Sequence, residues 1–88
     1  MYSLKISDKL ENILRKLYKK DKQRYDIIMQ KIDEIIDSDP NHYKNLRYDL
    51  KAFKRVHIDA HFVLIFRVDE ENKIVEFFDL NHHDKIYY

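Results

Sequence analysis

The chain has 88 residues and a nearly balanced charge, with 17 lysines and arginines against 16 acidic residues. An apolar content of 44% supports one compact domain over residues 1–88 and leaves no room for a second. The chain has no cysteine, which excludes disulfides and cysteine-based metal sites, and it has no apolar run long enough for a membrane span or a secretory leader. We therefore expect a cytoplasmic protein that does not enter the membrane.

The first residues predict a short strand that leads into a helix. Tyr2, Leu4 and Ile6 alternate with polar residues, which is typical of a half-buried strand. A helix should follow, with Asp8 as its cap and Glu11 reaching back to complete the cap.

Two amphipathic helices should follow the strand and form a hairpin. Apolar residues recur at helical spacing in two stretches, which are Leu10, Ile13, Leu14 and Leu17, and then Tyr25, Ile28, Met29, Ile32, Ile35 and Ile36. The link at residues 19–21 is short, so the helices should run antiparallel, and residues 37–40 should end the second one. Both stripes are expected in the core, so function should be sought elsewhere.

The second half of the chain changes to a period of two. Residues 52–59, 62–69 and 73–80 read as strands joined by tight links, which predicts an antiparallel meander. The order is β-α-α-β-β-β. We expect an α+β fold in which a two-helix hairpin packs on one face of a mainly antiparallel four-stranded sheet and leaves the other face free for a ligand.

The cationic charge is concentrated in the middle of the chain. Residues 41–67 carry six lysines and arginines against two acidic residues, whereas residues 68–88 carry two against six. Such a patch favours phosphate binding, although a solvated sheet face would show the same pattern. On the first meander strand Arg55, His57 and Asp59 should share one face, and Lys54 should point to the opposite face.

The chain resembles the RelE/ParE superfamily of toxin-antitoxin toxins over essentially its whole length. The resemblance rests on the element order, on Lys44-Asn45-Leu46 before the meander, on the hairpin ending in residues 64–68, and on the closing residues 81–87. The closing segment, Asn-His-His-Asp-Lys-Ile-Tyr, is similar to that family's G-H-R-x-x-V-Y ending.

The resemblance implies the toxin of a type II toxin-antitoxin system. RelE-like members cut messenger RNA in the ribosomal decoding site without a metal or cofactor, and an antitoxin wraps around them and silences them. The implied partners are therefore a RelB-type antitoxin, in a heterodimer or heterotetramer, together with the ribosome and messenger RNA.

The resemblance also implies site residues. Tyr87 matches the family's catalytic tyrosine, His83 stands where a basic residue is usual, and Lys54, Arg55 and His57 match the basic residues of the first meander strand. RNA-binding side chains are expected at Lys44, Arg47, Lys51, His82 and Lys85.

The chemistry of RNA cleavage gives these residue types plausible roles. Attack by the 2′-OH needs a base, cations that stabilise the added charge on phosphorus, and an acid for the leaving oxygen. Histidine can serve as base or acid, tyrosine can serve as base where nearby cations lower its pKa, and Arg55, Lys54 and Arg47 could hold the phosphate.

One departure leaves alternatives open. Many RelE-like nucleases carry an arginine where this chain has Val63. The alternatives are a ParE-like toxin that inhibits a partner such as DNA gyrase by binding alone, and a degenerate RNA-binding module. His57 and His61 have a ligand-like spacing, but a hairpin turn is expected between them, so we predict no metal site.

Overall fold

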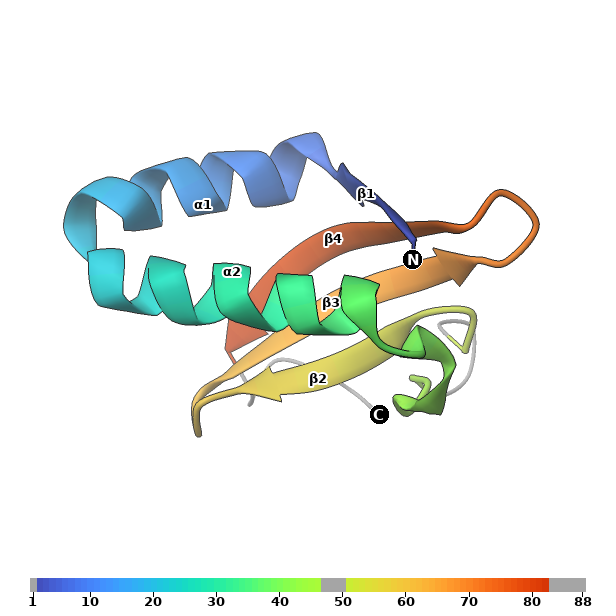
Figure 1. Ribbon diagram of the computed structural model, residues 1–88. Coiled ribbons are helices and arrows are strands. Elements are labelled where there is room, and N and C mark those ends of the chain that lie inside the picture. The colour runs from blue at the N-terminus through green and yellow to red at the C-terminus, as the bar shows by residue number, and fades with distance from the viewer. Residues whose placement is uncertain (1, 47–50, 83–88) are drawn as a thin grey trace.

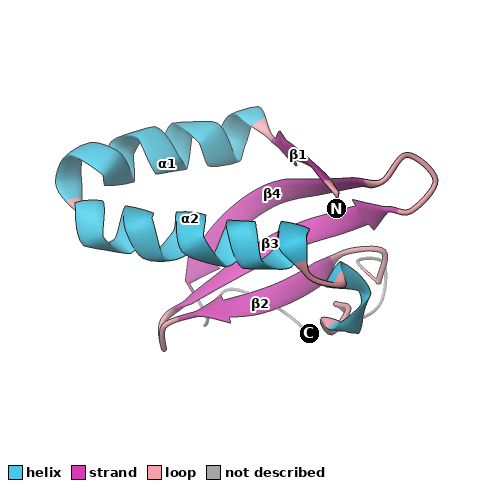
Figure 2. Ribbon diagram, viewed as in Figure 1, coloured by secondary structure: helices cyan, strands magenta, loops and turns pink. Residues whose placement is uncertain are grey.

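The computed structural model describes residues 2–46 and 51–82. The elements are β1 (Ser3–Ile6), α1 (Asp8–Lys20), α2 (Lys22–Asp37), the 3-10 helix η1 (Pro40–His42), β2 (Lys54–Ile58), β3 (Phe62–Asp69) and β4 (Ile74–His82). The strands form one sheet in the order β1-β4-β3-β2, antiparallel except for the parallel pairing of β1 with β4. Figures 1 and 2 show both helices on the same side of this sheet. The predicted fold class is confirmed.

The predicted strands agree closely with the observed ones. β3 has the predicted bounds, β2 is shorter than the predicted 52–59, and β4 runs to His82 instead of residue 80. The chain makes its two hairpin turns without glycine, and it places Asp59 at φ 47° and Lys73 at φ 54° in the left-handed region. Aspartate tolerates this region better than most residues, whereas lysine has no such advantage.

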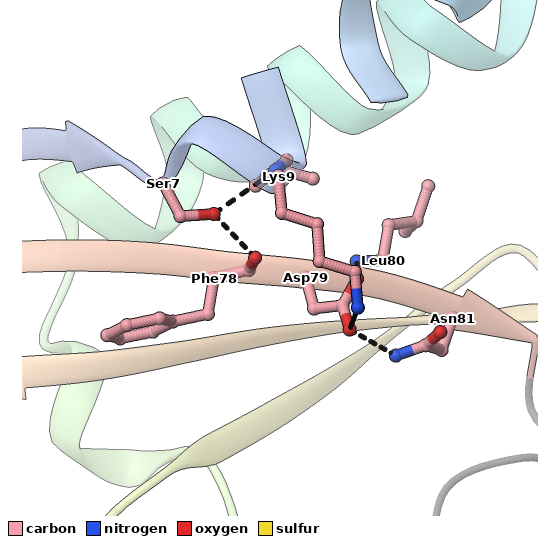
Figure 3. A network of polar contacts seen from close by, with 7 residues as sticks. Ser7, Lys9, Phe78, Asp79, Leu80 and Asn81 are labelled. Atoms are coloured by element: carbon pink, nitrogen blue, oxygen red, sulfur yellow. Dashed lines mark hydrogen bonds and ion pairs between the residues drawn. The ribbon is translucent and has the colours of Figure 1, made fainter. Parts of the chain in front are cut away.

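The start of α1 differs from the prediction, because Ser7 rather than Asp8 is the cap. The Ser7 hydroxyl oxygen accepts a hydrogen bond from the backbone N–H of Leu10 at 3.1 Å and donates one to the carbonyl of Phe78 at 2.6 Å (Figure 3). Asp8 is the first helical residue, and its carboxylate interacts favourably with the positive end of the helix dipole. Glu11 pairs with Arg15 at 2.8 Å, so it does not close a capping box.

The main core fills the space between the helical hairpin and the sheet. Its buried residues are Leu10, Leu14, Ile28, Ile32, Ile35, Ile36, Ile58, Leu64, Phe66, Val75, Phe77 and Leu80. Both predicted helical stripes contribute to it, as their periodicity indicated. The edge strand β1 is more exposed than the predicted half-buried strand, since Leu4 keeps 46% of its surface accessible. Within the described ranges, no helix combines the length and the apolar character that crossing a membrane requires.

The side of the sheet away from the helices is called the outer face below. It was predicted to be free for a ligand, but part of it is covered. A second cluster of buried residues, Leu46, Val63 and Ile65, lies there with Phe53 packed against it. The segment before β2 reaches the outer face because its backbone pairs with the edge of β2. Leu46 N–H donates to the carbonyl of Phe53 at 2.9 Å, and Arg55 N–H donates to the carbonyl of Lys44 at 3.0 Å.

Candidate functional site

β2 places Arg55 and His57 on the outer face. Val56 and Ile58 of the same strand pack into the main core on the helical side. Because side chains alternate along a strand, Arg55 and His57 project to the opposite side. Their Cα partners on β3 are Ile65 and Val63, so both lie beside the central strand. The predicted shared face is therefore confirmed for these two residues. It is wrong for Asp59, which lies in the turn after β2 and pairs with Arg24 of α2 at 3.4 Å.

Lys54 points toward the helical side and is held there by three oxygen acceptors. Its ammonium donates to the carbonyls of Asn41 at 3.3 Å and Tyr43 at 3.1 Å, and to Oδ1 of Asn45 at 3.0 Å. A lysine ammonium has three protons, so these bonds use its full donor capacity. The geometry separates Lys54 from Arg55 and His57, and it makes Lys54 a tether for the segment that precedes β2.

Val63 lies where the resemblance leads one to expect an arginine. It is 0% exposed and packs with Leu46 and Ile65 on the outer face, where it is the Cα partner of His57. An apolar, fully buried side chain at this point cannot hold a phosphate. The cations of the outer face therefore border an apolar patch at this position.

His82 lies at the end of β4, opposite Phe62 of β3, and its ring centroid is 5.2 Å from that of Phe62. Phe62 packs against the main core, so His82 is on the helical side, away from Arg55 and His57. His61 is 6.4 Å from His82 between ring centroids, and its backbone N–H donates to Asp59. The described residues contain no group of three or more histidine, aspartate or glutamate side chains placed to hold a metal ion.

Of the remaining predicted site residues, the structure describes only two. Lys44 and Lys51 are exposed and lie in the segment that flanks the edge of β2. Four others fall outside the described residues, so their roles stay predictions; they are Arg47, His83, Lys85 and Tyr87.

Sequence reasoning missed a cation and an aromatic pair on the outer face. Arg67 of β3 lies over two rings, with its guanidinium carbon 5.3 Å from the centroid of Phe78 and 5.9 Å from that of Phe53. The two rings meet edge to face at 4.9 Å. Alternation along β3 from Val63 and Ile65 to Arg67 was a signal for this placement. The position of Phe78 depends on the irregularity where β4 pairs with residues 65 and 66, which the sequence pattern does not reveal.

Among the residues that the structure describes, the largest shift in pKa is that of Glu70 in the β3–β4 turn. Hydrogen bonds from Lys73, Tyr2 and Asn41 lower the pKa of Glu70 from 4.5 to about 2. This carboxylate joins the start of the chain, the 3-10 helix and the turn, so it fastens the fold. In the other turn, hydrogen bonding by the His61 N–H and the charge of Arg24 lower the pKa of Asp59.

Comparison with known proteins gives a consistent set of relatives. The family model described as the ParE toxin of the type II toxin-antitoxin system parDE matches residues 2–87. A protein of Methanocaldococcus jannaschii named "Putative toxin RelE4" is 54% identical over 87 residues, which cover 99% of this chain and 92% of that protein.

Solved structures share the fold at low sequence identity. The RelBE2 toxin-antitoxin complex from Mycobacterium tuberculosis contains a chain with a TM-score of 0.77 and 18% identity, covering 93% of this chain and 91% of that one. The YoeB/ParE toxin from Agrobacterium tumefaciens has a TM-score of 0.80 and 15% identity, and the match covers 92% of this chain and 98% of that one. At such identities the likeness concerns the fold alone.

Proposed function

Because the chain belongs to the ParE toxin family of type II toxin-antitoxin systems, we propose that it is a toxin that cuts messenger RNA on the ribosome. Its place of action is then the cytoplasm. The observation that carries the proposal is the pair Arg55 and His57, which β2 places together on the outer face of the sheet. A cation beside an imidazole supplies two of the groups that RNA cleavage requires.

The proposed reaction is an internal phosphoryl transfer. The 2′-OH loses its proton and attacks the adjacent phosphorus, the bond from phosphorus to the 5′-oxygen breaks, and the leaving oxygen takes a proton. Arg55 stabilises the charge that builds up on the phosphoryl oxygens, and His57 carries one of the two proton transfers. We assign the other proton transfer to His83 or Tyr87, for which the family resemblance implies a catalytic role.

An antitoxin is the second part of the proposal. The RelBE2 structure is a toxin-antitoxin complex, and one of its chains matches 93% of the present chain. This likeness supports such a partner here. We propose a RelB-type antitoxin that covers the outer face and so removes Arg55 from contact with RNA. Masking of this kind is a common use of segments that fold on binding.

A second function is favoured by two observations and must be tested beside the first. Val63 is apolar and buried where a phosphate-binding arginine is expected, and the ammonium of Lys54 is engaged by three oxygen acceptors on the other side. With fewer cations for phosphate, the chain would suit a ParE-like toxin that inhibits DNA gyrase by binding alone.

The deciding experiment uses ribosomes programmed with a defined messenger RNA, with cleavage mapped by primer extension. The wild type should cut in the decoding site. Arg55→Ala and His57→Ala should each slow cutting by roughly 100-fold or more, in line with the loss of one charge-stabilising or proton-transferring group. Lys16→Ala is the matched control, because it removes a cation from an exposed position of α1.

The same variants distinguish the two functions. Absence of cuts by the wild type, or equal cutting by all variants, would contradict the nuclease. Inhibition of gyrase supercoiling by the wild type, without any cut on the ribosome, would establish the binding toxin instead.

A further inference from the structure

The outer face carries a flat cation that lies on two aromatic rings. The guanidinium of Arg67 is 5.3 Å from the ring of Phe78 and 5.9 Å from the ring of Phe53, and 49% of the Arg67 side chain is exposed. Guanidinium groups stack on aromatic rings through one of their two planar faces. The two rings meet at 84°, so the guanidinium cannot lie flat on both of them, and the exposed half of the Arg67 side chain is the part that a planar ligand can reach.

The edge of the same guanidinium is already engaged. Its Nη2 atom donates to Oε1 of Glu76 at 3.3 Å, and the other oxygen of Glu76 lies 3.8 Å from the ammonium of Lys5. Part of the edge-on hydrogen-bonding capacity of Arg67 is thus directed into the sheet, and part of its charge is neutralised. The flat surface of the guanidinium and its other N–H groups remain for recognition, and the flat surface suits a planar ring.

This stack lies beside the residues proposed for phosphate chemistry. Ile65, the Cα partner of Arg55, is two residues before Arg67 on β3, so Arg67 is one pleat repeat of about 7 Å along the strand from that row. The row of His57 follows in the opposite direction, at Val63. The three rows form a strip in which the stack flanks the candidate cleavage groups.

We propose that Arg67, supported by Phe53 and Phe78, is a base-stacking subsite for single-stranded RNA. One nucleobase lies flat on the outward side of the guanidinium and thereby positions the neighbouring phosphate at Arg55. The inference rests on the proposed function, because it names the part of the outer face that holds the base. Charge agrees with this occupant, since three cations, Lys5, Arg55 and Arg67, outnumber two carboxylates, Glu76 and Asp79, among the charged residues of these rows.

The test pairs variants of Arg67 with removal of single bases from the RNA. Ribosomes are programmed with a messenger RNA whose decoding-site nucleotides carry 2′-deoxy sugars, which blocks attack by the 2′-OH and allows equilibrium binding of the full-length toxin to be measured. An abasic nucleotide then replaces each position in turn, in the decoding codon and directly after it. Arg67→Ala removes the flat surface, Arg67→Lys keeps the charge without the plane, and Lys16→Ala removes a cation elsewhere.

With intact RNA, Arg67→Ala should weaken binding roughly 5- to 150-fold, which is the range for losing one stacked base. Arg67→Lys should lose most of that factor, whereas Lys16→Ala should stay within about 2-fold of the wild type. At one position the abasic nucleotide should weaken the wild type by the same factor and leave Arg67→Ala unchanged, because both changes remove the same contact. Thermal unfolding of each variant checks that the fold is intact.

The outcomes separate this inference from the function on which it rests. Ribosome binding and cleavage by the wild type with unchanged affinity of Arg67→Lys would overturn the subsite alone, as would equal losses for Arg67→Ala at every abasic position. Loss of antitoxin binding in Arg67→Lys without loss of RNA binding would assign the stack to the protein partner and also overturn it. A wild type that neither binds nor cuts on programmed ribosomes would overturn both.

Discussion

Replacement of Lys54 by methionine separates a tether from a catalytic cation. The substitution keeps the length and the apolar stem of the side chain but removes the ammonium. Without it, the carbonyls of Asn41 and Tyr43 and Oδ1 of Asn45 lose their donor. We expect the segment before β2 to loosen and the whole domain to lose stability.

The size of the loss follows from the environment of each bond. The bond to the Tyr43 carbonyl is part-buried, so it falls at about 1.5–2 kcal/mol, within the range for hydrogen bonds to charged groups. The two exposed bonds, to Asn41 and Asn45, add about 0.5 kcal/mol or less each. A total of about 1.5–3 kcal/mol corresponds to a fall in Tm of roughly 6–24 °C for a domain of this size.

The assay is thermal unfolding followed by circular dichroism, with Lys51→Met as the matched control. Lys51 is an exposed lysine of the same segment, and the contact at this position is made by its backbone carbonyl, which accepts from Asn45 at 2.7 Å. Lys51→Met should therefore change stability by less than about 0.5 kcal/mol. The reasoning is refuted if Lys54→Met melts within about 3 °C of the wild type and nevertheless loses most of its ribosomal cleavage at 25 °C, since that result would make Lys54 a catalytic cation.

Three further predictions concern the turn, the helix cap and the missing arginine. Glu70→Gln should lower Tm at pH 7, and because the folded carboxyl has its pKa lowered from 4.5 to about 2, the difference from the wild type should shrink as pH falls through that window in acid titrations. An equal difference at pH 7 and pH 2 would contradict this linkage. Ser7→Ala should cost about 1–2 kcal/mol in urea unfolding, since it removes the cap of α1 and the bond to the Phe78 carbonyl, and a loss below about 0.3 kcal/mol would contradict the assigned cap. Val63→Arg should destabilise by about 3 kcal/mol or more, because the buried site beside Leu46 offers no room for a charge, and faster ribosomal cleavage by this variant would show instead that the site can admit a clamp.

The fold could be predicted from periodicity because each element has a clean pattern. The stripe of α2 buries its apolar residues as the spacing required, and the continuous apolar run of β3, residues 63–66, is buried on both faces of the sheet. The cap of α1 was misplaced because Ser7 and Asp8 are both good capping residues, and only the contact with β4 decides between them. The parallel partner of β1 is likewise a long-range choice that local sequence does not encode.

The site could be predicted only in part, for the same reason. Alternation along β2 correctly placed Arg55 and His57 together and Lys54 on the other side. The engagement of Lys54 depends on backbone carbonyls that the 3-10 helix and the following residues bring to it, and these do not show in a pattern of side chains. Leu46 covers part of the outer face because the neighbouring Asn45 pairs with Lys54 at the edge of the sheet, and this long-range pairing does not show in the local sequence.

The parallel pairing of β1 with β4 has a consequence for the order in which the chain acquires its shape. Ser3 pairs with Ile74 and Ile6 with Phe77, so a strand made among the first residues waits for one made among the last. Contacts between such distant segments form late, because the loop between them must close first. We expect a chain emerging during synthesis to gain its helices early and its sheet only after β4 has left the ribosome. A partly made toxin would then lack the folded surface that could harm the cell producing it.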